Sequence, residues 1–145
     1  MPYYSGQLQR RGSVAYVEQE PILFSDTIRN NITFGKPFDN NLYERVVTVS
    51  CLQSDFVILA AGDQTIVGEK GATLSGGQKA RVALARALYA NADIYLMDDP
   101  ISAVDSRVAK KIFEKCLKPL SQIKTVLLVT HQLDYILRCG EAIIL

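Results

Sequence analysis

Five consecutive residues have the types and the order that suit the binding of a phosphate group. They are Leu74, Ser75, Gly76, Gly77 and Gln78, and they open a segment rich in strong helix formers. The two glycines let backbone N–H groups approach an anion, and the N-terminus of a helix adds a favourable dipole. The hydroxyl of Ser75 and the amide of Gln78 can add donors. A lone Ser-Gly-Gly is a common turn, whereas the whole pentapeptide followed by Lys-Ala-Arg is a specific signal.

A pair of aspartates, Asp98 and Asp99, closes the apolar run 94–97. The carboxyl end of a buried parallel strand borders the crevice where ligands bind, so Asp98 can hold Mg²⁺ through its carboxylate, usually by way of water. Asp99 is a candidate base that orients an attacking water. For both residues the simpler alternative is a carboxylate that caps the following turn.

Two further polar residues follow predicted strands. Gln19 lies in the loop after 12–17, where its amide can reach a metal-bound water, and the alternative is a solvated polar side chain. His131 follows the apolar run 125–129 and can contact a terminal phosphate oxygen or position a water. Its alternative is a core histidine whose ring is satisfied by the backbone.

The composition is that of one globular domain: 145 residues, 48% hydrophobic and 21% charged. The net charge of +1 gives no electrostatic reason to expect a nucleic acid partner. The three cysteines lack the spacing of zinc ligands, and their sparse, odd number suits a reducing compartment. No apolar run approaches the ~20 residues of a membrane span. We therefore expect any membrane association to come through a partner or through other parts of the polypeptide.

The apolar patterning predicts an α/β fold. The strands are continuous apolar runs, which is typical of a mainly parallel sheet covered on both faces, whereas the middle of the chain lacks such runs and looks all-helical. We predict an α/β core from 1–25 and 90–145, and a helical subdomain with the following helix from 26–89. The predicted strands are 12–17, 94–97, 125–129 and 142–145, and the predicted helices are 26–32, 42–52, 55–59, 77–90, 105–117 and 133–138.

Taken together, these residues resemble the ATP-binding cassette (ABC) family. Order and spacing agree along almost the whole chain. The segment 74–78 matches the signature loop, 94–99 is similar to the Walker B strand, Gln19 to the Q-loop, 102–105 to the D-loop, and His131 to the switch histidine. The resemblance implies a partial P-loop NTPase-like core with a mainly parallel sheet and an all-helical signature subdomain.

Three segments narrow the resemblance. Residues 25–35 look like the segment after the Q-loop in ABC exporters, and 65–71 resemble the exporter X-loop, which touches the membrane domains. Residues 98–105 are similar to the first nucleotide-binding domain of the multidrug-resistance-associated (C) subfamily, which carries aspartate where other cassettes have the catalytic glutamate. The shorter side chain of Asp99 sets its carboxylate back by about an ångström, which can cost roughly 100-fold in rate. We therefore expect slow or no hydrolysis at the site that Asp99 lines.

The resemblance implies an ATP-binding cassette of a membrane exporter, working at the cytoplasmic face with ATP and Mg²⁺. Its partners would be a second nucleotide-binding domain and the transmembrane domains of the same transporter, and the parent protein would be an ATP hydrolase. The pentapeptide and Asp105 would contact ATP held by the second cassette. In this cassette's own site Asp98 and Gln19 would serve Mg²⁺, and Asp99, His131 and Gln19 would serve the chemistry.

One expected motif is missing from the sequence. A Walker A loop needs Gly-x-x-x-x-Gly-Lys-Ser/Thr, but the only Gly-Lys pair, Gly35-Lys36, precedes Pro37 and lacks the upstream glycine. We expect a fragment that begins after Walker A, binds ATP poorly by itself and leaves apolar strand faces uncovered. The alternatives are a regulatory nucleotide-binding module of an ABC-type channel or channel regulator, a soluble ABC protein of DNA repair or translation, and a non-functional fragment.

Overall fold

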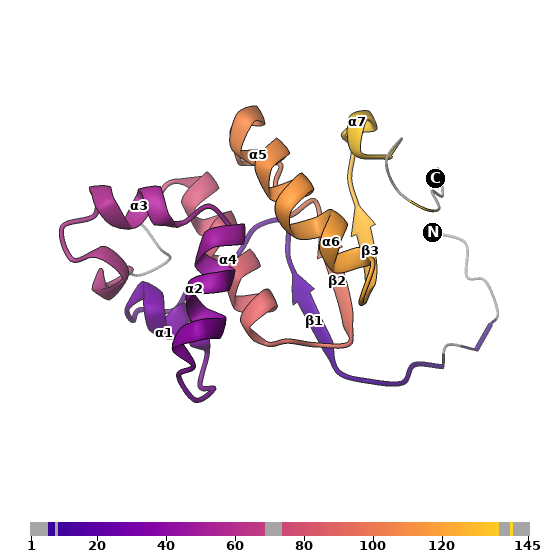
Figure 1. Ribbon diagram of the computed structural model, residues 1–145, viewed down its shortest axis with the longest axis horizontal. Helices are drawn as coiled ribbons and strands as arrows, with labels where there is room; N and C mark the ends of the chain where they lie inside the picture. Colours follow the sequence, from indigo (N-terminus) through magenta and orange to yellow (C-terminus); the bar gives the residue numbers. More distant parts are fainter. Residues whose placement is uncertain (1–5, 8, 69–73, 137–139, 141–145) are drawn as a thin grey trace.

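The computed structural model describes residues 6–7, 9–68, 74–136 and 140, and within them three parallel strands form a sheet in the order β1-β2-β3 (Figure 1). The strands are β1 Val14–Val17, β2 Ile94–Asp98 and β3 Thr125–Val129, each within two residues of its predicted bounds. The long crossover from β1 to β2 is mostly helical. The prediction of an α/β fold with a mainly parallel sheet is confirmed. The predicted strand 142–145 lies outside the described residues.

The helices follow the predicted order. Each predicted helix has a counterpart, and the largest differences are at the helix ends, where sequence signals are weakest. The segments are α1 Ile28–Thr33, α2 Asn40–Val49, α3 Gln53–Ile58, the 3₁₀ turn η1 Gly62–Gln64, α4 Gly76–Tyr89, α5 Ser106–Ile112, the π-helical turn η3 Phe113–Leu117, α6 Lys118–Ser121 and α7 Leu133–Ile136. Within the described residues no helix is long and apolar enough to span a membrane.

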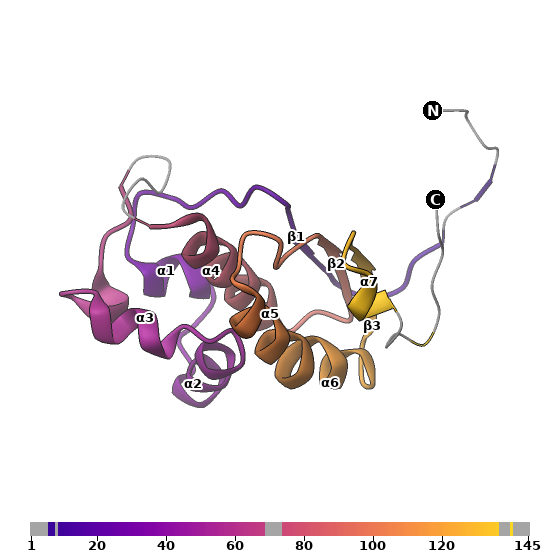
Figure 2. The same cartoon turned by 90° about the horizontal axis from the view of Figure 1, so that it is seen from above.

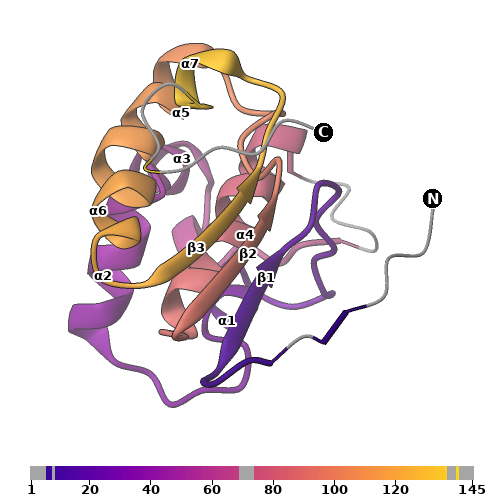
Figure 3. The same cartoon turned by 90° about the vertical axis from the view of Figure 1, so that its right-hand side faces the viewer.

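The helices from the middle of the chain gather at one end of the molecule (Figures 1 and 2). α1, α2 and α3 lie there, and α4 lies between them and the sheet, packed against α1, α2 and β1. α5 and α6 lie beside the sheet on the same side as α4 (Figure 3). This arrangement agrees with a helical segment at 26–89 beside an α/β core, while the exact boundary stays a prediction.

The sheet is covered on only one face by the described residues, which differs from the expected two-sided cover. Ala15, Val17, Tyr95 and Met97 are buried, and the register places them on one face of the sheet. Figure 3 shows the helices on one side of the sheet. The opposite face leaves apolar side chains in solvent: Tyr16 is 58% exposed, and its row continues through Leu96 to Leu127, which is 62% exposed. Apolar residues on both faces explain why the strands appear as continuous apolar runs in the sequence.

The helix predicted to end at 117 continues to Ser121. The N–H of Lys118 donates to the carbonyl of Phe113, five residues back, and this π-helical turn lets Pro119 sit near the start of α6 without breaking the helix. The turn also places the Phe113 ring on that of Tyr135 in α7, with centroids 4.4 Å apart. The helix after β3 is thereby tied to the helix after β2.

Side chains cap the starts of two helices. Asp39 caps α2, because its Oδ1 accepts from the N–H of Leu42 at 3.0 Å. At α1 the cap is Thr27, whose Oγ1 accepts from the N–H of Asn30 at 3.0 Å, rather than Ser25 or Asp26. Asp26 instead accepts from the N–H of Thr27 and from the side chain of Asn30.

Candidate functional site

The parallel register brings the predicted polar residues to one edge of the sheet. Val17 at the end of β1 pairs with Met97, and Asp98 at the end of β2 pairs with Val129. Gln19 follows two residues after β1, and His131 follows two residues after β3. Gln19 is exposed and Asp98 is half-buried. The carboxyl ends of the strands therefore gather an amide, a carboxylate and an imidazole at the edge where ligands bind in open α/β sheets.

Asp99 is buried and turned toward His131. Its side chain is 6% exposed, and its Oδ2 lies 2.6 Å from Nδ1 of His131, whose side chain is 73% exposed. Thr130 donates its hydroxyl to Oδ1 at 3.5 Å. The backbone of Asp99 has a φ of +45°, a left-handed conformation that aspartate tolerates better than most residues. His131 is thus a surface residue with a carboxylate partner, and not a core histidine satisfied by the backbone.

The pentapeptide forms the first turn of α4, which begins at Gly76. Ser75 and Gln78 make a reciprocal capping box: Ser75 Oγ accepts from the N–H of Gln78 at 3.2 Å, and Gln78 Oε1 accepts from the N–H of Ser75 at 2.9 Å. Helix geometry gives the N–H groups of Gly76 and Gly77 no intrahelical acceptor. The Ser75 hydroxyl keeps its proton for another acceptor. These three groups can bind an anion together.

The side chains of Leu74 and Gln78 already have partners within the chain. Leu74 is 6% exposed and belongs to the hydrophobic core, so its side chain holds the turn in place. The Nε2 of Gln78 donates to Oδ1 of Asp55 at 3.0 Å. Ser75 and Gly76 are exposed, so they are the members of the pentapeptide that a ligand can reach directly.

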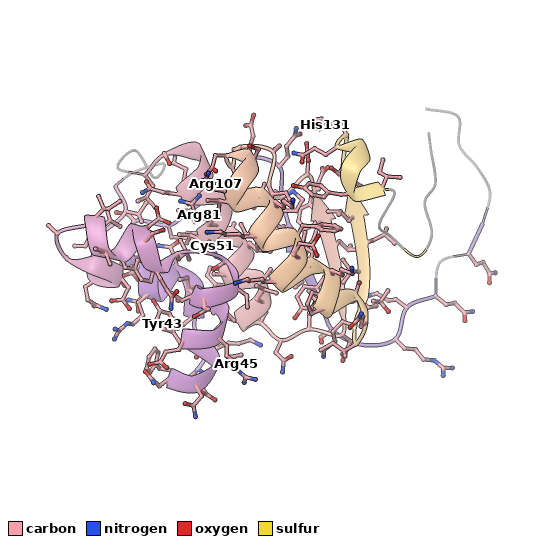
Figure 4. All side chains as sticks on the ribbon, turned by 45° about the horizontal axis from the view of Figure 1, so that its top comes forward. Tyr43, Arg45, Cys51, Arg81, Arg107 and His131 are labelled. Carbon is pink, nitrogen blue, oxygen red and sulfur yellow. The ribbon has the colours of Figure 1, made fainter. Side chains whose placement is uncertain are left out.

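A buried ion pair supports this turn, and the sequence did not single it out. Asp55 in α3 accepts from Nη2 of Arg81 in α4 at 2.8 Å and from its Nε at 3.1 Å. The two side chains are 9% and 11% exposed. Figure 4 shows Arg81 among the helices, away from His131. The available signal was Asp55 itself, a carboxylate at the start of the predicted helix 55–59.

Asp105 caps the helix after β2. Its Oδ1 accepts from the N–H of Val108 at 3.1 Å, at the start of α5, and the residue is exposed. The turn before it is held by Asp99, whose carbonyl accepts from the N–H and the hydroxyl of Ser102 at 3.2 and 3.0 Å. The role of Asp105 in nucleotide contact stays a prediction.

The donors fit part of an ATP·Mg²⁺ site. Ser75 and the two glycine N–H groups suit phosphate oxygens. No group of three or more His, Cys, Asp or Glu side chains converges within the described residues. Mg²⁺ in nucleotide enzymes needs only one or two carboxylates and completes its shell with phosphate oxygens and water, so Asp98 alone fits that pattern. The lysine of a phosphate loop is not among the 145 residues.

Comparison with known proteins agrees with this geometry. The family model described as "ABC transporter" matches residues 4–102. The chain is 52% identical over 141 residues to the "Probable multidrug resistance-associated protein lethal(2)03659" of Drosophila melanogaster, covering 97% of this chain and 10% of that protein. It is 49% identical over 145 residues to the "ATP-binding cassette sub-family C member 4" of Mus musculus, covering 100% of this chain and 11% of that protein.

A solved structure shares the fold. The "Structure of a bacterial Atm1-family ABC exporter with ATP bound" superposes with a TM-score of 0.79 at 33% sequence identity, and the match covers 86% of this chain and 22% of that one. The chain spans about a tenth of the length of the curated relatives it matches.

Proposed function

This chain belongs to the ABC transporter family, and on that premise we propose that it is part of the ATP-binding cassette of a membrane exporter of the C-subfamily type. The cassette binds ATP and Mg²⁺ at an interface with a second cassette and works at the cytoplasmic face of the membrane. ATP hydrolysis by the parent protein drives transport. The observation that carries the proposal is the exposed Ser75–Gly76 turn at the N-terminus of α4.

The turn caps the phosphates of ATP held by the second cassette. The donors available there are the Ser75 hydroxyl and the first N–H groups of α4, and the positive end of the helix dipole favours the same negative charge. Phosphoryl transfer depends mainly on positioning and on neutralising charge. Uncharged hydrogen-bond donors such as the Ser75 hydroxyl and these N–H groups are therefore enough to position the phosphates. Asp105, the N-cap of α5 after β2, is the further residue that we assign to this pocket.

Asp98, Gln19 and His131 serve a different nucleotide, at this cassette's own site. Mg²⁺ bound there would neutralise the charge of the phosphate oxygens. Asp98 would hold that ion at the end of β2, and Gln19 would reach a water bound to it. Asp99 contributes little as a base, because its short, buried carboxylate is already directed at the ring of His131. Hydrolysis at this site is accordingly slow.

An exposed aromatic patch supports contact with a membrane domain of the same transporter. We define it as Ile22, Phe24 and Phe34, which are 61%, 51% and 56% exposed. The guanidinium of Arg86 lies under both aromatic rings, and its Nε donates to the carbonyl of Asn31 at 2.8 Å. A hollow of about 610 Å³ opens beside Phe24 and Phe34. Apolar side chains that gather in an exposed patch are typical of a docking surface.

A charge placed at the turn tests the proposal. Gly76→Asp puts a carboxylate in the first turn of α4, against the phosphates, so the affinity of the full-length polypeptide for ATP should fall at least roughly tenfold. Asn41→Asp is the control, because it adds the same charge to the first turn of α2, where Asn41 is exposed. Equilibrium binding of ATP with Mg²⁺ measures both. Equal affinities for the two variants would remove the turn from the nucleotide site.

A further inference from the structure

The two glycines of the pentapeptide have different surroundings. Neither Gly76 nor Gly77 has a positive φ, so the helical backbone does not require glycine at either position. Alanine is the better helix former by about 1 kcal/mol in a helix interior. The backbone conformation therefore explains neither glycine, and the space around the two differs.

The reason at Gly77 lies within the chain. A Cβ added to Gly77 would lie 2.9 Å from the carbonyl oxygen of Ala103 and 3.6 Å from Cα of Val104. Real Cβ atoms essentially never come so close to a backbone oxygen. A backbone oxygen cannot rotate away as the end of a side chain can. The absent side chain of Gly77 thus admits the loop 102–105 against the first turn of α4.

The reason at Gly76 is not found within the described residues. A Cβ added there would meet Cβ of Ala103 at 3.7 Å, an ordinary van der Waals distance. Gly76 is also exposed, whereas Gly77 is half-buried. The surroundings of Gly76 tolerate a methyl group, so packing within the described residues does not require glycine at this position.

The loop seated on Gly77 is anchored at the paired acid. The carbonyl of Asp99 accepts from the N–H and the hydroxyl of Ser102, next to Ala103. The carboxylate of Asp99 is in turn held by His131 at 2.6 Å. A continuous series of contacts therefore joins His131, Asp99, the loop 102–105 and the first turn of α4.

We propose that Gly77 is a positioning residue that seats the loop 102–105 against the first turn of α4, so that the loop and the turn move together. Gly76 has no such packing role within the described residues. This inference deepens the function proposed above, because the turn that Gly77 positions is the one proposed there to contact the phosphates of ATP. The seating of the loop is a property of the chain without nucleotide.

Hydrogen exchange of the full-length polypeptide without nucleotide tests the seating. Gly77→Ala should speed amide exchange in 102–105 about tenfold and lower the melting temperature by roughly 3 °C. Gly76→Ala is the matched control, since it makes the same chemical change one residue earlier in the same helix. It should leave exchange in 102–105 unchanged and should not lower the melting temperature. Equal exchange in 102–105 for the two variants would overturn the proposal.

A milder pair of variants covers the case in which Gly77→Ala does not fold. Ser102→Ala removes the hydroxyl that donates to the Asp99 carbonyl at 3.0 Å, and the loosened loop should speed exchange at the amides of 76–78 several-fold. Ser121→Ala is its control, because that hydroxyl also donates to the carbonyl three residues back, at 2.8 Å. No difference between these two serine variants at 76–78 would contradict a shared movement.

An ATP-binding measurement distinguishes a failure of this proposal from a failure of the proposed ATP-binding function. If Gly76→Ala weakens ATP binding while leaving exchange in 102–105 unchanged, the division between the two glycines is supported. If neither glycine variant changes ATP binding but Gly77→Ala still loosens the loop, the turn is not a nucleotide cap and the seating role stands.

Discussion

Removing the carboxylate of Asp55 should destabilise the turn that opens α4 more than any surface substitution. Asp55→Asn leaves the guanidinium of Arg81 with its charge uncompensated and its side chain only 11% exposed. The change also weakens the acceptor of Gln78 Nε2, which lies 3.0 Å away. Breaking a buried pair by removing one partner typically costs 3–5 kcal/mol, and the slight exposure places the expected loss near about 3 kcal/mol.

Urea denaturation measures this loss. With a slope of about 2 kcal/mol/M for a small domain, a loss of about 3 kcal/mol lowers the midpoint by about 1.5 M. Domains of this size are stable by only about 5–15 kcal/mol, so the shift should be easy to resolve. Exchange at the amides of 75–78 should rise in parallel, because Gln78 links the ion pair to the turn.

A second aspartate–arginine pair supplies the control. Asp63 accepts from Nε of Arg29 at 2.8 Å, but the Arg29 side chain is 41% exposed. Solvent screens this pair, and Asp63→Asn should cost about 1 kcal/mol or less. If Asp55→Asn is no more destabilising than Asp63→Asn, the reasoning from burial is refuted. Replacing both Asp55 and Arg81 by apolar residues should recover much of the loss.

Three further predictions concern Cys116, Asp63 and Asp99. Burial, with a smaller contribution from Cys51, raises the pKa of the Cys116 thiol to about 12, so Cys116 should resist iodoacetamide at pH 8 and react only on unfolding; labelling of the native protein at the unfolded rate would contradict its burial. Burial acts to raise the pKa of Asp63, but hydrogen bonds from Arg29 and Tyr43 outweigh it and hold that pKa below its usual value. The stabilisation is therefore complete above pH ~4 and is lost as the pH falls through the lowered pKa, so Asp63→Asn should flatten the acid limb of a stability–pH curve; an unchanged limb would refute the assignment. Asp99→Glu should speed single-turnover hydrolysis at the site that Asp99 lines, because the carboxylate moves forward by about an ångström; an unchanged rate would remove the short side chain as the cause of slow turnover.

The positions of the strand-end residues could be predicted because their signals are local. Short apolar runs gave each of the three described strands to within two residues, and a polar residue directly after such a run in a parallel sheet falls at the ligand edge. The same reasoning placed Asp98 at the crevice where ligands bind, and it placed Gln19 and His131 in the segments that follow two predicted strands. The signature turn was also a local signal, since a serine and a glutamine three residues apart form a capping box.

The contacts that hold these residues could not be predicted, because they join distant segments. The bond between Asp99 and His131 depends on the register of β2 and β3 and on a left-handed backbone at Asp99. The pair of Asp55 with Arg81 spans two helices whose crossing no periodicity reveals. Gly77 and Ala103 meet only after the whole chain has folded.

Local signals also competed at some element ends. Ser25, Asp26 and Thr27 all have side chains that can cap a helix. The cap of α1 is Thr27, because its Oγ1 accepts from the N–H of Asn30. The helix predicted to end at 117 continues past Pro119, because the π-helical turn before this proline changes which N–H groups need acceptors. The described residues leave the second face of the sheet uncovered.

The most direct test of the account is a structure of the full-length polypeptide with ATP and Mg²⁺ bound, in which the distance from Ser75 Oγ to the nearest phosphate oxygen is measured. We expect a hydrogen-bond distance of about 2.5–3.0 Å to a nucleotide held by a second cassette, with Asp98 and His131 facing a different nucleotide. Phosphate oxygens that all lie well beyond contact distance of Ser75 and Gly76, or one nucleotide that touches Ser75 and Asp98 of the same chain, would contradict the central claim.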